Sequence, residues 1–270
     1  MSKSKNLELV HSYQPLISII LPTYNQAKYL PEALDSIFNQ TLRDFELVIV
    51  NDGSTDDTSN ILKKYAQTYN FKLINQTNQG LPKALNTGFT EAKGKYLTWT
   101  SSDNIMLPAM LEKLYGALEN NPPISVFYAD WIFIDDAGTV LSRFETLDFD
   151  RCLLLQFNFV HCCFLFRREV FEKLGGYYPE YIYSEDWDFW IRASRHFKMK
   201  HLPETLYKYR IHSGSMTNEI IRETAPQKIR YPEFSKRLRH RYPLDWYLGK
   251  IKKQIIKNRL GFDPLDKWLK

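Results

Sequence analysis

A strand end, a polar loop and a helix start follow one another in the ten residues Trp99-Thr100-Ser101-Ser102-Asp103-Asn104-Ile105-Met106-Leu107-Pro108. Tyr96 to Trp99 has the composition of a buried strand, and Pro108 favours the first turn of a helix. In an open α/β sheet, ligands bind beside the loops that leave the carboxyl ends of strands. Asp103 can there hold a hard cation that bridges protein and phosphate oxygens, or it can simply cap the next helix.

Three segments upstream repeat the same order of strand, polar loop and helix. Near-continuous apolar runs at 16–21 and 45–50 are typical of parallel strands buried on both faces, and residues 71–74 predict a third strand. Apolar residues at helical spacing follow each of them. This alternation predicts an α/β fold with a Rossmann-like, mostly parallel sheet flanked by helices.

The pattern changes after a further strand predicted at 124–128. Residues 135–138 have the composition of a hairpin turn, and a helix is expected to begin near Glu185. From residue 219 onward, basic and aromatic residues are separated by prolines, which predicts a helical C-terminal extension.

Composition excludes several classes of protein. The 270 residues are 44% hydrophobic, enough for a substantial core, and no apolar run approaches the roughly 18 residues that span a bilayer. Residues 216–270 carry 14 Lys/Arg against 6 Asp/Glu, whereas the rest of the chain carries 22 against 25. The main body is therefore not a nucleic-acid-binding surface, and we expect no nucleic-acid partner. Cys152, Cys162 and Cys163 match no zinc pattern and are interpreted as packing residues.

The basic C-terminal segment allows two interpretations. Its apolar arc includes Leu248 and Ile251 and is flanked by lysines such as Lys250 and Lys253. The arc can pack on the main body and leave a solvated basic face, or it can attach reversibly to an anionic membrane. We expect a cytoplasmic protein, with peripheral contact to the inner face of a membrane as the second reading.

Four polar loops follow strands of the predicted sheet, and we expect them to meet at one edge. They are 23–25, 51–54, 78–80 and 101–104, and each is small, polar or glycine-bearing, which suits close approach to a nucleotide. Asp52 in the second loop can accept from a base imide N–H or from a ribose hydroxyl. Tyr24 offers a flat surface for a pyrimidine.

The chain resembles the inverting, nucleotide-sugar-dependent glycosyltransferases of family 2, which have the GT-A fold. The resemblance covers roughly residues 15 to 215, in the family's order. It rests on Pro22-Thr23-Tyr24-Asn25, Asn51-Asp52-Gly53-Ser54-Thr55-Asp56, Asn78-Gln79-Gly80, Asn86-Thr87-Gly88, Asp103-Asn104-Ile105-Met106-Leu107-Pro108, Phe166-Arg167-Arg168, Gly175-Gly176-Tyr177 and Glu185-Asp186-Trp187-Asp188-Phe189-Trp190.

The resemblance implies a domain organisation. Residues 1–215 would form the GT-A catalytic domain, with a nucleotide-binding half at about 15–130 and an acceptor-binding half at about 131–215. Residues 216–270 would form the basic, aromatic, helical extension.

The resemblance also implies site residues. Nucleotide contacts are expected from Pro22, Thr23, Tyr24, Asn25, Asp52, Gly80, Lys83, Ser102 and Asp103. Asp103 matches the last acid of the family's Asp-x-Asp metal motif, and His212 can approach the same cation or be an ordinary core histidine. Asp186 matches the general base. The acceptor side is expected to include Glu185, Trp187 and His161, the last of which can equally be a packing residue.

One departure from the family concerns the metal. Two or three acids are usual where this chain has Ser101-Ser102-Asp103-Asn104, and cation affinity falls with ligand charge. We therefore expect Mn²⁺ or Mg²⁺ to be held weakly unless the donor's diphosphate supplies further oxygens.

The expected activity is transfer of a sugar, from a UDP-sugar in the first instance, to a glycan or lipid-linked hydroxyl, as in cell-surface polysaccharide synthesis. An alternative is a nucleotide-sugar-binding protein of the same fold that has lost turnover along with the missing acids. A nucleotidyltransferase would need a glycine- and Arg/Lys-rich phosphate loop after the first strand, and Pro22-Thr23-Tyr24-Asn25 is not one.

Overall fold

The computed structural model describes residues 14–216 and 231–260. Its strands are β1 (Ile17–Thr23), β2 (Phe45–Asn51), β3 (Lys72–Asn75), β4 (Tyr96–Trp99), β5 (Ile105–Met106), β6 (Val126–Ile134), β7 (Val140–Phe144), β8 (Phe164–Arg167) and β9 (Met199–Arg210). Its helices are α1 (Leu30–Phe38), α2 (Thr58–Tyr65), α3 (Leu81–Glu91), α4 (Met110–Glu119), α5 (Arg151–Leu154), α6 (Arg168–Leu174), the 3₁₀ turn η1 (Pro179–Tyr181), α7 (Glu185–Ala193), α9 (Tyr231–Arg241) and α10 (Pro243–Leu260).

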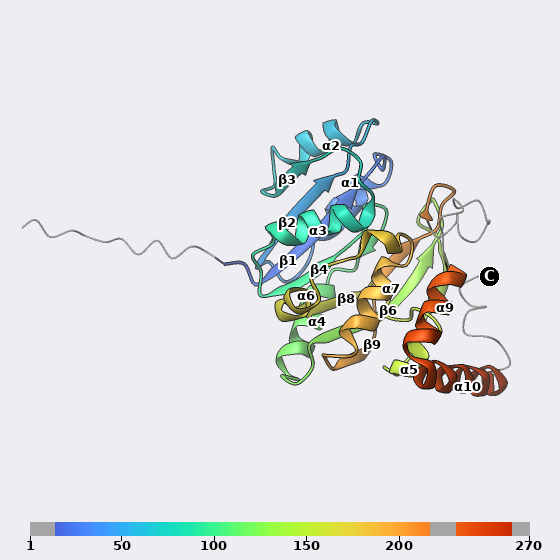
Figure 1. Ribbon diagram of the computed structural model, residues 1–270. Helices are drawn as coiled ribbons and strands as arrows, with labels where there is room; N and C mark the ends of the chain where they lie inside the picture. The colour runs from blue at the N-terminus through green and yellow to red at the C-terminus, as the bar shows by residue number, and fades with distance from the viewer. Residues whose placement is uncertain (1–13, 217–230, 261–270) are drawn as a thin grey trace, which may run out of the picture.

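One mixed sheet organises the molecule, with the strand order β3-β2-β1-β4-β8-β6-β9-β5 and with β7 paired to β6 (Figure 1). The first four strands in this order are parallel neighbours. The long β6–β9 ladder is also parallel, whereas β8 runs antiparallel to both β4 and β6. The predicted α/β fold with a mostly parallel sheet is therefore confirmed, and the antiparallel β8 is the element that joins its two halves.

Helices cover both faces of this sheet. Alternation along β1 divides its side chains between two cores, with Ile20 on one face and Ile19 and Leu21 on the other. The α3 and α7 helices pack on the face of Ile20, and α1 and α4 pack on the opposite face. Gly88 lets α3 approach β1 closely, since a Cβ atom there would lie 2.3 Å from Ile20 Cγ2.

The C-terminal helices α9 and α10 pack beside α5 and α7 (Figure 1). Leu238 of α9 and Tyr242, which lies between α9 and α10, are buried in the core that contains Trp187 and Trp190. Gly249 of α10 rests on α5 so closely that a Cβ atom would collide with the Cys152 carbonyl oxygen. The extension is thus packed on the main body, although the division of the chain at residue 215 stays a prediction.

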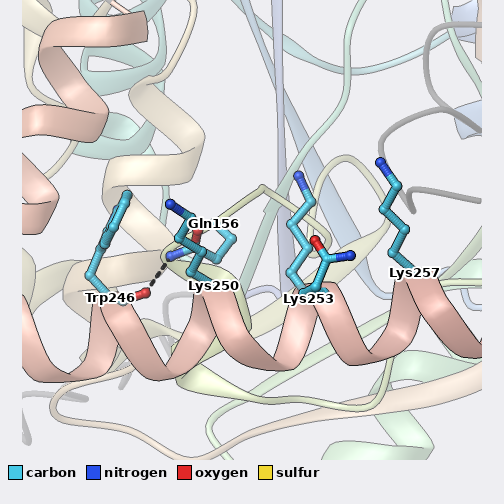
Figure 2. Close-up of a pocket in the computed structure, with 6 residues that line it drawn as sticks. Gln156, Trp246, Lys250, Lys253 and Lys257 are labelled. Atoms are coloured by element: carbon cyan, nitrogen blue, oxygen red, sulfur yellow. Dashed lines mark hydrogen bonds between the residues drawn. The ribbon is translucent and has the colours of Figure 1, made fainter.

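Two residues of the apolar arc predicted for α10, Leu248 and Ile251, do not make that contact, and the side chains of Ile255, Ile256 and Leu260 lie outside the described part of the structure. Leu248 and Ile251 point into solvent, and Ile251 is 58% exposed. Figure 2 shows Lys250 and Lys253 instead pointing from one side of the helix toward a pocket lined by Gln156. Leu248 and Ile251 thus lie on a different side of α10 from Lys250 and Lys253. Attachment of α10 to a membrane stays a prediction. Within the described ranges, no helix combines the length and apolar character needed to cross a bilayer.

Candidate active site

The polar loops after β1 and β2 are tied together by Asn25 and Ser54. Asn25 has a φ of +51°. Its side-chain oxygen accepts from the backbone N–H of Thr55 at 2.7 Å, and its own N–H donates to Ser54 Oγ at 3.0 Å. Beside it, the Thr23 hydroxyl is buried without a hydrogen-bond partner among the described residues, while Tyr24 is 46% exposed. The first loop therefore offers a ligand both an unsatisfied hydroxyl and an open aromatic ring.

Asp52 organises the loop that follows β3. Its carboxylate accepts from Gln76 Nε2 at 2.7 Å and from the backbone N–H groups of Gln79 and Gly80, both at 2.9 Å. Gly53 lets this loop come close, because its φ is +78° and a Cβ atom there would lie 2.7 Å from the Asn78 nitrogen. Asp52 thus fixes the conformation of the loop at 76–80. Its direct contact with a base or ribose stays a prediction.

The loop held by Asp52 leads directly into α3. Gly80, with a φ of +86°, precedes the helix, and Lys83 is exposed in its first turn. Lys83 forms no ion pair with another described residue, so its ammonium group is available to an anionic ligand. This placement is compatible with a contact between Lys83 and the donor's phosphates or sugar. That contact stays a prediction.

The side chains of Asp103, which follows β4, and His212, which follows β9, are in contact. The distance from His212 Nε2 to Asp103 Oδ2 is 3.1 Å, and the Gly214 N–H donates to His212 Nδ1. Because Nδ1 is an acceptor, the ring proton is placed on Nε2, where it donates to Asp103. The other carboxylate oxygen, Asp103 Oδ1, is buried and has no hydrogen-bond partner within the described part of the chain. Ser102 beside it is buried as well.

This pair suits a divalent cation that receives further ligands from elsewhere. A carboxylate and an imidazole are acceptable ligands for Mn²⁺, and the unbonded oxygen gives the carboxylate spare capacity. Among the described residues, however, no group of three or more His, Cys, Asp or Glu side chains is placed to hold a metal. Binding at His212 Nε2 would also require loss of the ring proton.

Arg210, at the end of β9, binds the backbone of the loop that carries Asp103. Its Nε donates to the Asp103 carbonyl at 2.9 Å, and Nη1 donates to the carbonyls of Asp135 and Asp136 at 3.1 and 3.0 Å. Nη2 is ion-paired with Glu32 on α1. The buried guanidinium therefore joins three elements around Asp103, and nothing in its sequence context predicted it.

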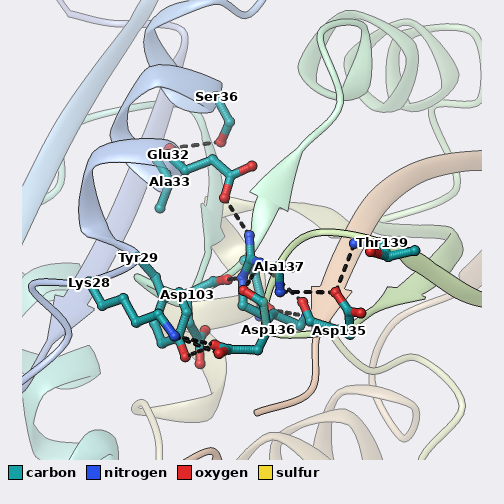
Figure 3. Close-up of polar contacts among 12 residues, drawn as sticks. Lys28, Tyr29, Glu32, Ala33, Ser36, Asp103, Asp135, Asp136, Ala137 and Thr139 are labelled. Carbon is teal, nitrogen blue, oxygen red and sulfur yellow. Dashed lines mark hydrogen bonds and ion pairs between the residues drawn. The ribbon is translucent and has the colours of Figure 1, made fainter.

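The tip of the β6–β7 hairpin also contacts the two residues that precede α1 (Figure 3). Lys28 and Tyr29 both bond the Asp136 carboxylate, and the Lys28 ammonium lowers the pKa of Asp136. The Tyr29 ring also packs on the His212 imidazole, with 4.5 Å between centroids. The hairpin predicted at 135–138 is confirmed, and its tip lies beside Asp103 and His212.

A side-chain clamp joins the nucleotide half to the segment before α7. Asn86 on α3 bonds both the N–H and the carbonyl of Tyr177, at 2.8 and 2.7 Å. The Tyr177 hydroxyl accepts from the Trp99 indole at 3.0 Å. A Cβ atom at Gly176 would lie 2.5 Å from Asn86 Oδ1, so this position requires glycine. The clamp therefore depends on the amide of Asn86, on the absence of a side chain at Gly176 and on the hydroxyl of Tyr177.

Three carboxylates occupy the first turn of α7, and their surroundings separate their roles. Asp188 is ion-paired at 2.7 Å with Arg192, which also bonds the carbonyls of Leu174 and Gly176. Glu185 is only 4% exposed, and burial together with the charge of Asp186 raises its pKa. Asp186 is intermediate in exposure as a residue, whereas Glu185 and Asp188 are buried, and its carboxyl group lies in densely packed surroundings. Among the residues that the structure describes, Asp186 is therefore the most exposed acid of this turn, and its carboxylate forms no ion pair.

The Asp186 carboxylate is held by two uncharged donors. Oδ2 accepts from Asn158 Nδ2 at 2.8 Å, and Oδ1 accepts from the backbone N–H of Trp187 at 2.7 Å. Burial raises the pKa of Asp186, and these two donors oppose the effect by stabilising the ionised form. A carboxyl group with a raised pKa can accept a proton near neutral pH.

Trp187 and His161 are close in the chain to Asp186 and to its partner Asn158. The Trp187 indole is buried and donates to the Leu154 carbonyl at 2.6 Å. His161 is buried between the rings of Trp131 and Tyr209, and burial lowers its pKa to about 3. Both side chains are buried in the core. The acceptor-side role expected for Trp187 and His161, and the packing alternative for His161, stay predictions.

Comparisons with known proteins identify the family of the chain. Residues 18–175 match the family model described as glycosyl transferase family 2. The chain is 32% identical over 237 residues to an uncharacterized glycosyltransferase of Rickettsia prowazekii, which covers 84% of this chain and 73% of that protein.

Two solved structures are similar in fold. S. aureus TarS 1–349 in complex with UDP superposes with a TM-score of 0.63 at 22% identity, over 77% of this chain and 63% of that one. The mannosyltransferase PcManGT from Pyrobaculum calidifontis, in complex with GDP-Man and Mn²⁺, superposes with a TM-score of 0.61 at 18% identity, over 96% and 84%. The chain thus spans less than two thirds of the TarS structure. The predicted GT-A fold is confirmed, and with the match over more than half of its length the chain belongs to glycosyltransferase family 2.

Proposed function

We propose that this protein transfers a sugar, with inversion at the anomeric carbon, from a UDP-sugar to a hydroxyl of a glycan or lipid-linked acceptor. The observation that carries the proposal is Asp186, a partly exposed residue whose carboxyl group has a raised pKa and forms no ion pair with another described residue. UDP is proposed because TarS, which is similar in fold, binds it. Synthesis of a cell-surface polysaccharide is the proposed setting.

The proposed reaction is a single in-line displacement. The Asp186 carboxylate takes the proton of the acceptor hydroxyl while that oxygen forms the new bond to the anomeric carbon. The bond between the anomeric carbon and the donor's phosphate oxygen breaks, and the nucleoside diphosphate leaves with its electron pair. Tyr24 and Thr23 would bind the base and ribose, and Lys83 would meet the phosphates.

Asp103 and His212 are the residues that would hold a divalent cation. A bound Mn²⁺ or Mg²⁺ would supply Lewis-acid stabilisation of the charge that develops on the departing diphosphate. The chain's own part is to present a carboxylate oxygen that no other described residue bonds, and an imidazole that contacts Tyr29 and Gly214.

A donor screen tests the proposal. Thermal unfolding with UDP-, GDP- and dTDP-sugars in the presence of Mn²⁺ should show the largest increase in Tm with a UDP-sugar, because a ligand that binds only the folded state stabilises it. Tyr24→Ala, which removes the exposed ring, should reduce this increase, whereas Tyr69→Ala, another exposed tyrosine outside the four loops, should not. Equal shifts with all nucleotides, or none with any, would count against a UDP-sugar donor.

The metal requirement gives a second prediction. Calorimetric titration of Mn²⁺ should detect no tight binding to the free protein and clear binding to the protein saturated with UDP, because two protein ligands need the diphosphate oxygens to complete the site. Asp103→Asn should abolish the binding that depends on UDP. Tight binding of Mn²⁺ to the free wild-type protein would contradict the prediction.

A binding protein without turnover is the second candidate, favoured by Ser101 and Ser102 in place of acids. The two candidates differ in one measurement. A transferase releases UDP from its donor when an acceptor is supplied, and a binding protein does not.

A further inference from the structure

Asn158 connects the segment between α5 and β8 to the first turn of α7. Its amide nitrogen donates to Asp186 Oδ2 at 2.8 Å, and its amide oxygen accepts from the His161 backbone N–H at 3.2 Å. The second contact fixes which way the amide faces, because only the carbonyl oxygen can accept from an N–H group. The NH₂ group is therefore committed to the carboxylate of Asp186.

We propose that Asn158 is a positioning residue for the general base, and that its amide sets the plane in which the Asp186 carboxylate meets the acceptor hydroxyl. The inference rests on the proposed role of Asp186. The Trp187 N–H bonds the other carboxylate oxygen, so the group is held at both ends and each oxygen keeps a lone pair for the incoming proton.

The lack of charge on Asn158 is central to this role. A Lys or Arg at the same place would stabilise the ionised carboxylate so strongly that it would lose affinity for the proton it must accept. An amide orients the carboxylate and offsets only part of the effect of burial. The base is thereby left with a pKa above that of an exposed aspartate.

The segment that carries Asn158 is itself anchored on both sides. The Leu154 carbonyl accepts from the Trp187 indole at 2.6 Å, and Gln156 Nε2 donates to the Trp246 carbonyl on α10 at 2.8 Å. The C-terminal helix α10 thus holds the chain two residues before Asn158.

The direct test is the ionisation of Asp186 in the full chain labelled with ¹³C at the aspartate carboxyl carbons. The Asp186 resonance is identified by its loss in Asp186→Asn. In Asn158→Ala its pKa should rise by about one unit, since one uncharged donor to the ionised form is removed. Asn158→Asp, which keeps the size of the side chain, should raise it further by adding a like charge. Asn60→Ala is the matched control, because Asn60 bonds the Asp57 carboxylate at 2.7 Å on the surface.

The kinetic test uses the same variants and the donor found in the screen. In Asn158→Ala the acid limb of the kcat/KM profile should move to higher pH. At pH values below the pKa, kcat/KM should fall about tenfold, because a pKa one unit higher leaves a tenth as much ionised base. An unchanged Asp186 pKa in both Asn158 variants, with Tm near that of the wild type, overturns the proposal. Full transfer by Asp186→Asn would instead overturn the proposed base, and the ¹³C titration would still report whether Asn158 acts on Asp186.

Discussion

Asp186→Asn is expected to lower the rate of sugar transfer by about 10²- to 10⁴-fold, the usual contribution of a positioned general base. The amide keeps the size of the side chain and can still contact Asn158, but it cannot take a proton from the acceptor. Affinity for UDP should stay close to that of the wild type, because the nucleotide loops lie on other strands. The measurement is transfer rate at saturating donor, together with UDP affinity by calorimetry.

Glu185→Gln is the matched control for this substitution. Glu185 is adjacent in the chain, and burial with the charge of Asp186 favours its protonated form, which glutamine imitates. Its replacement should therefore change the rate far less than Asp186→Asn. If Glu185→Gln abolished transfer while Asp186→Asn retained it, the assignment of the base would have to be exchanged between the two.

The pH dependence of the wild type follows from the same group. A base acts when ionised, so kcat/KM should rise with pH as Asp186 loses its proton. Because burial raises the pKa of Asp186, this rise should occur at a higher pH than for an exposed aspartate. The raised pKa has the opposite effect on stability, since the folded state binds the proton more tightly than the unfolded chain does. The contribution of Asp186 is present below the unfolded pKa and is lost as pH rises through the folded pKa.

Arg210→Met is expected to cost about 2–4 kcal/mol of folding free energy, the range for a buried charged group whose partners are left unsatisfied. The substitution leaves the carbonyls of Asp103, Asp135 and Asp136 without their donor. Glu32 loses its partner too, but its side chain is half exposed and water compensates for much of that loss. Urea unfolding measures the change as a lower midpoint at an unchanged m-value.

Two further variants sharpen this test. Arg210→Lys keeps the charge, but a single ammonium group cannot reach all the carbonyls that the guanidinium fork contacts, so most of the loss should persist. Lys28→Met removes another cation that binds the same hairpin, at Asp136, and should change stability little because that ion pair is exposed. A midpoint for Arg210→Met equal to that of the wild type would show that Arg210 does not hold the loop together.

The strands of the nucleotide half were predictable because their signal is local. The β1 strand is buried at every position, so its sequence is a plain apolar run, and the strand predicted at 71–74 lies at Lys72–Asn75. The twelve-residue β9 has no such signal. It contains Pro203, its residues alternate irregularly between buried and partly exposed, and its register against β6 shifts beside Asp130.

The helical extension shows a limit of periodicity. Helical spacing correctly predicted that Leu248 and Ile251 share one face of a helix. It could not predict which face meets the body, and the contact is made through Gly249, whose missing side chain allows close approach to α5. The exposure of Ile251 is therefore a property of the packing, not of the pattern.

By itself the sequence determined the α/β fold of the nucleotide half, the family, and the positions of the candidate acids Asp103 and Asp186. These follow from patterns within a few residues, or from short motifs in a fixed order. Only the tertiary structure decided which groups act on those acids. Arg210 reaches the Asp103 loop across 107 residues of chain, and Asn158 reaches Asp186 across 28. Such pairs depend on the path of the sheet between them, and that path is set by the packing of the whole core.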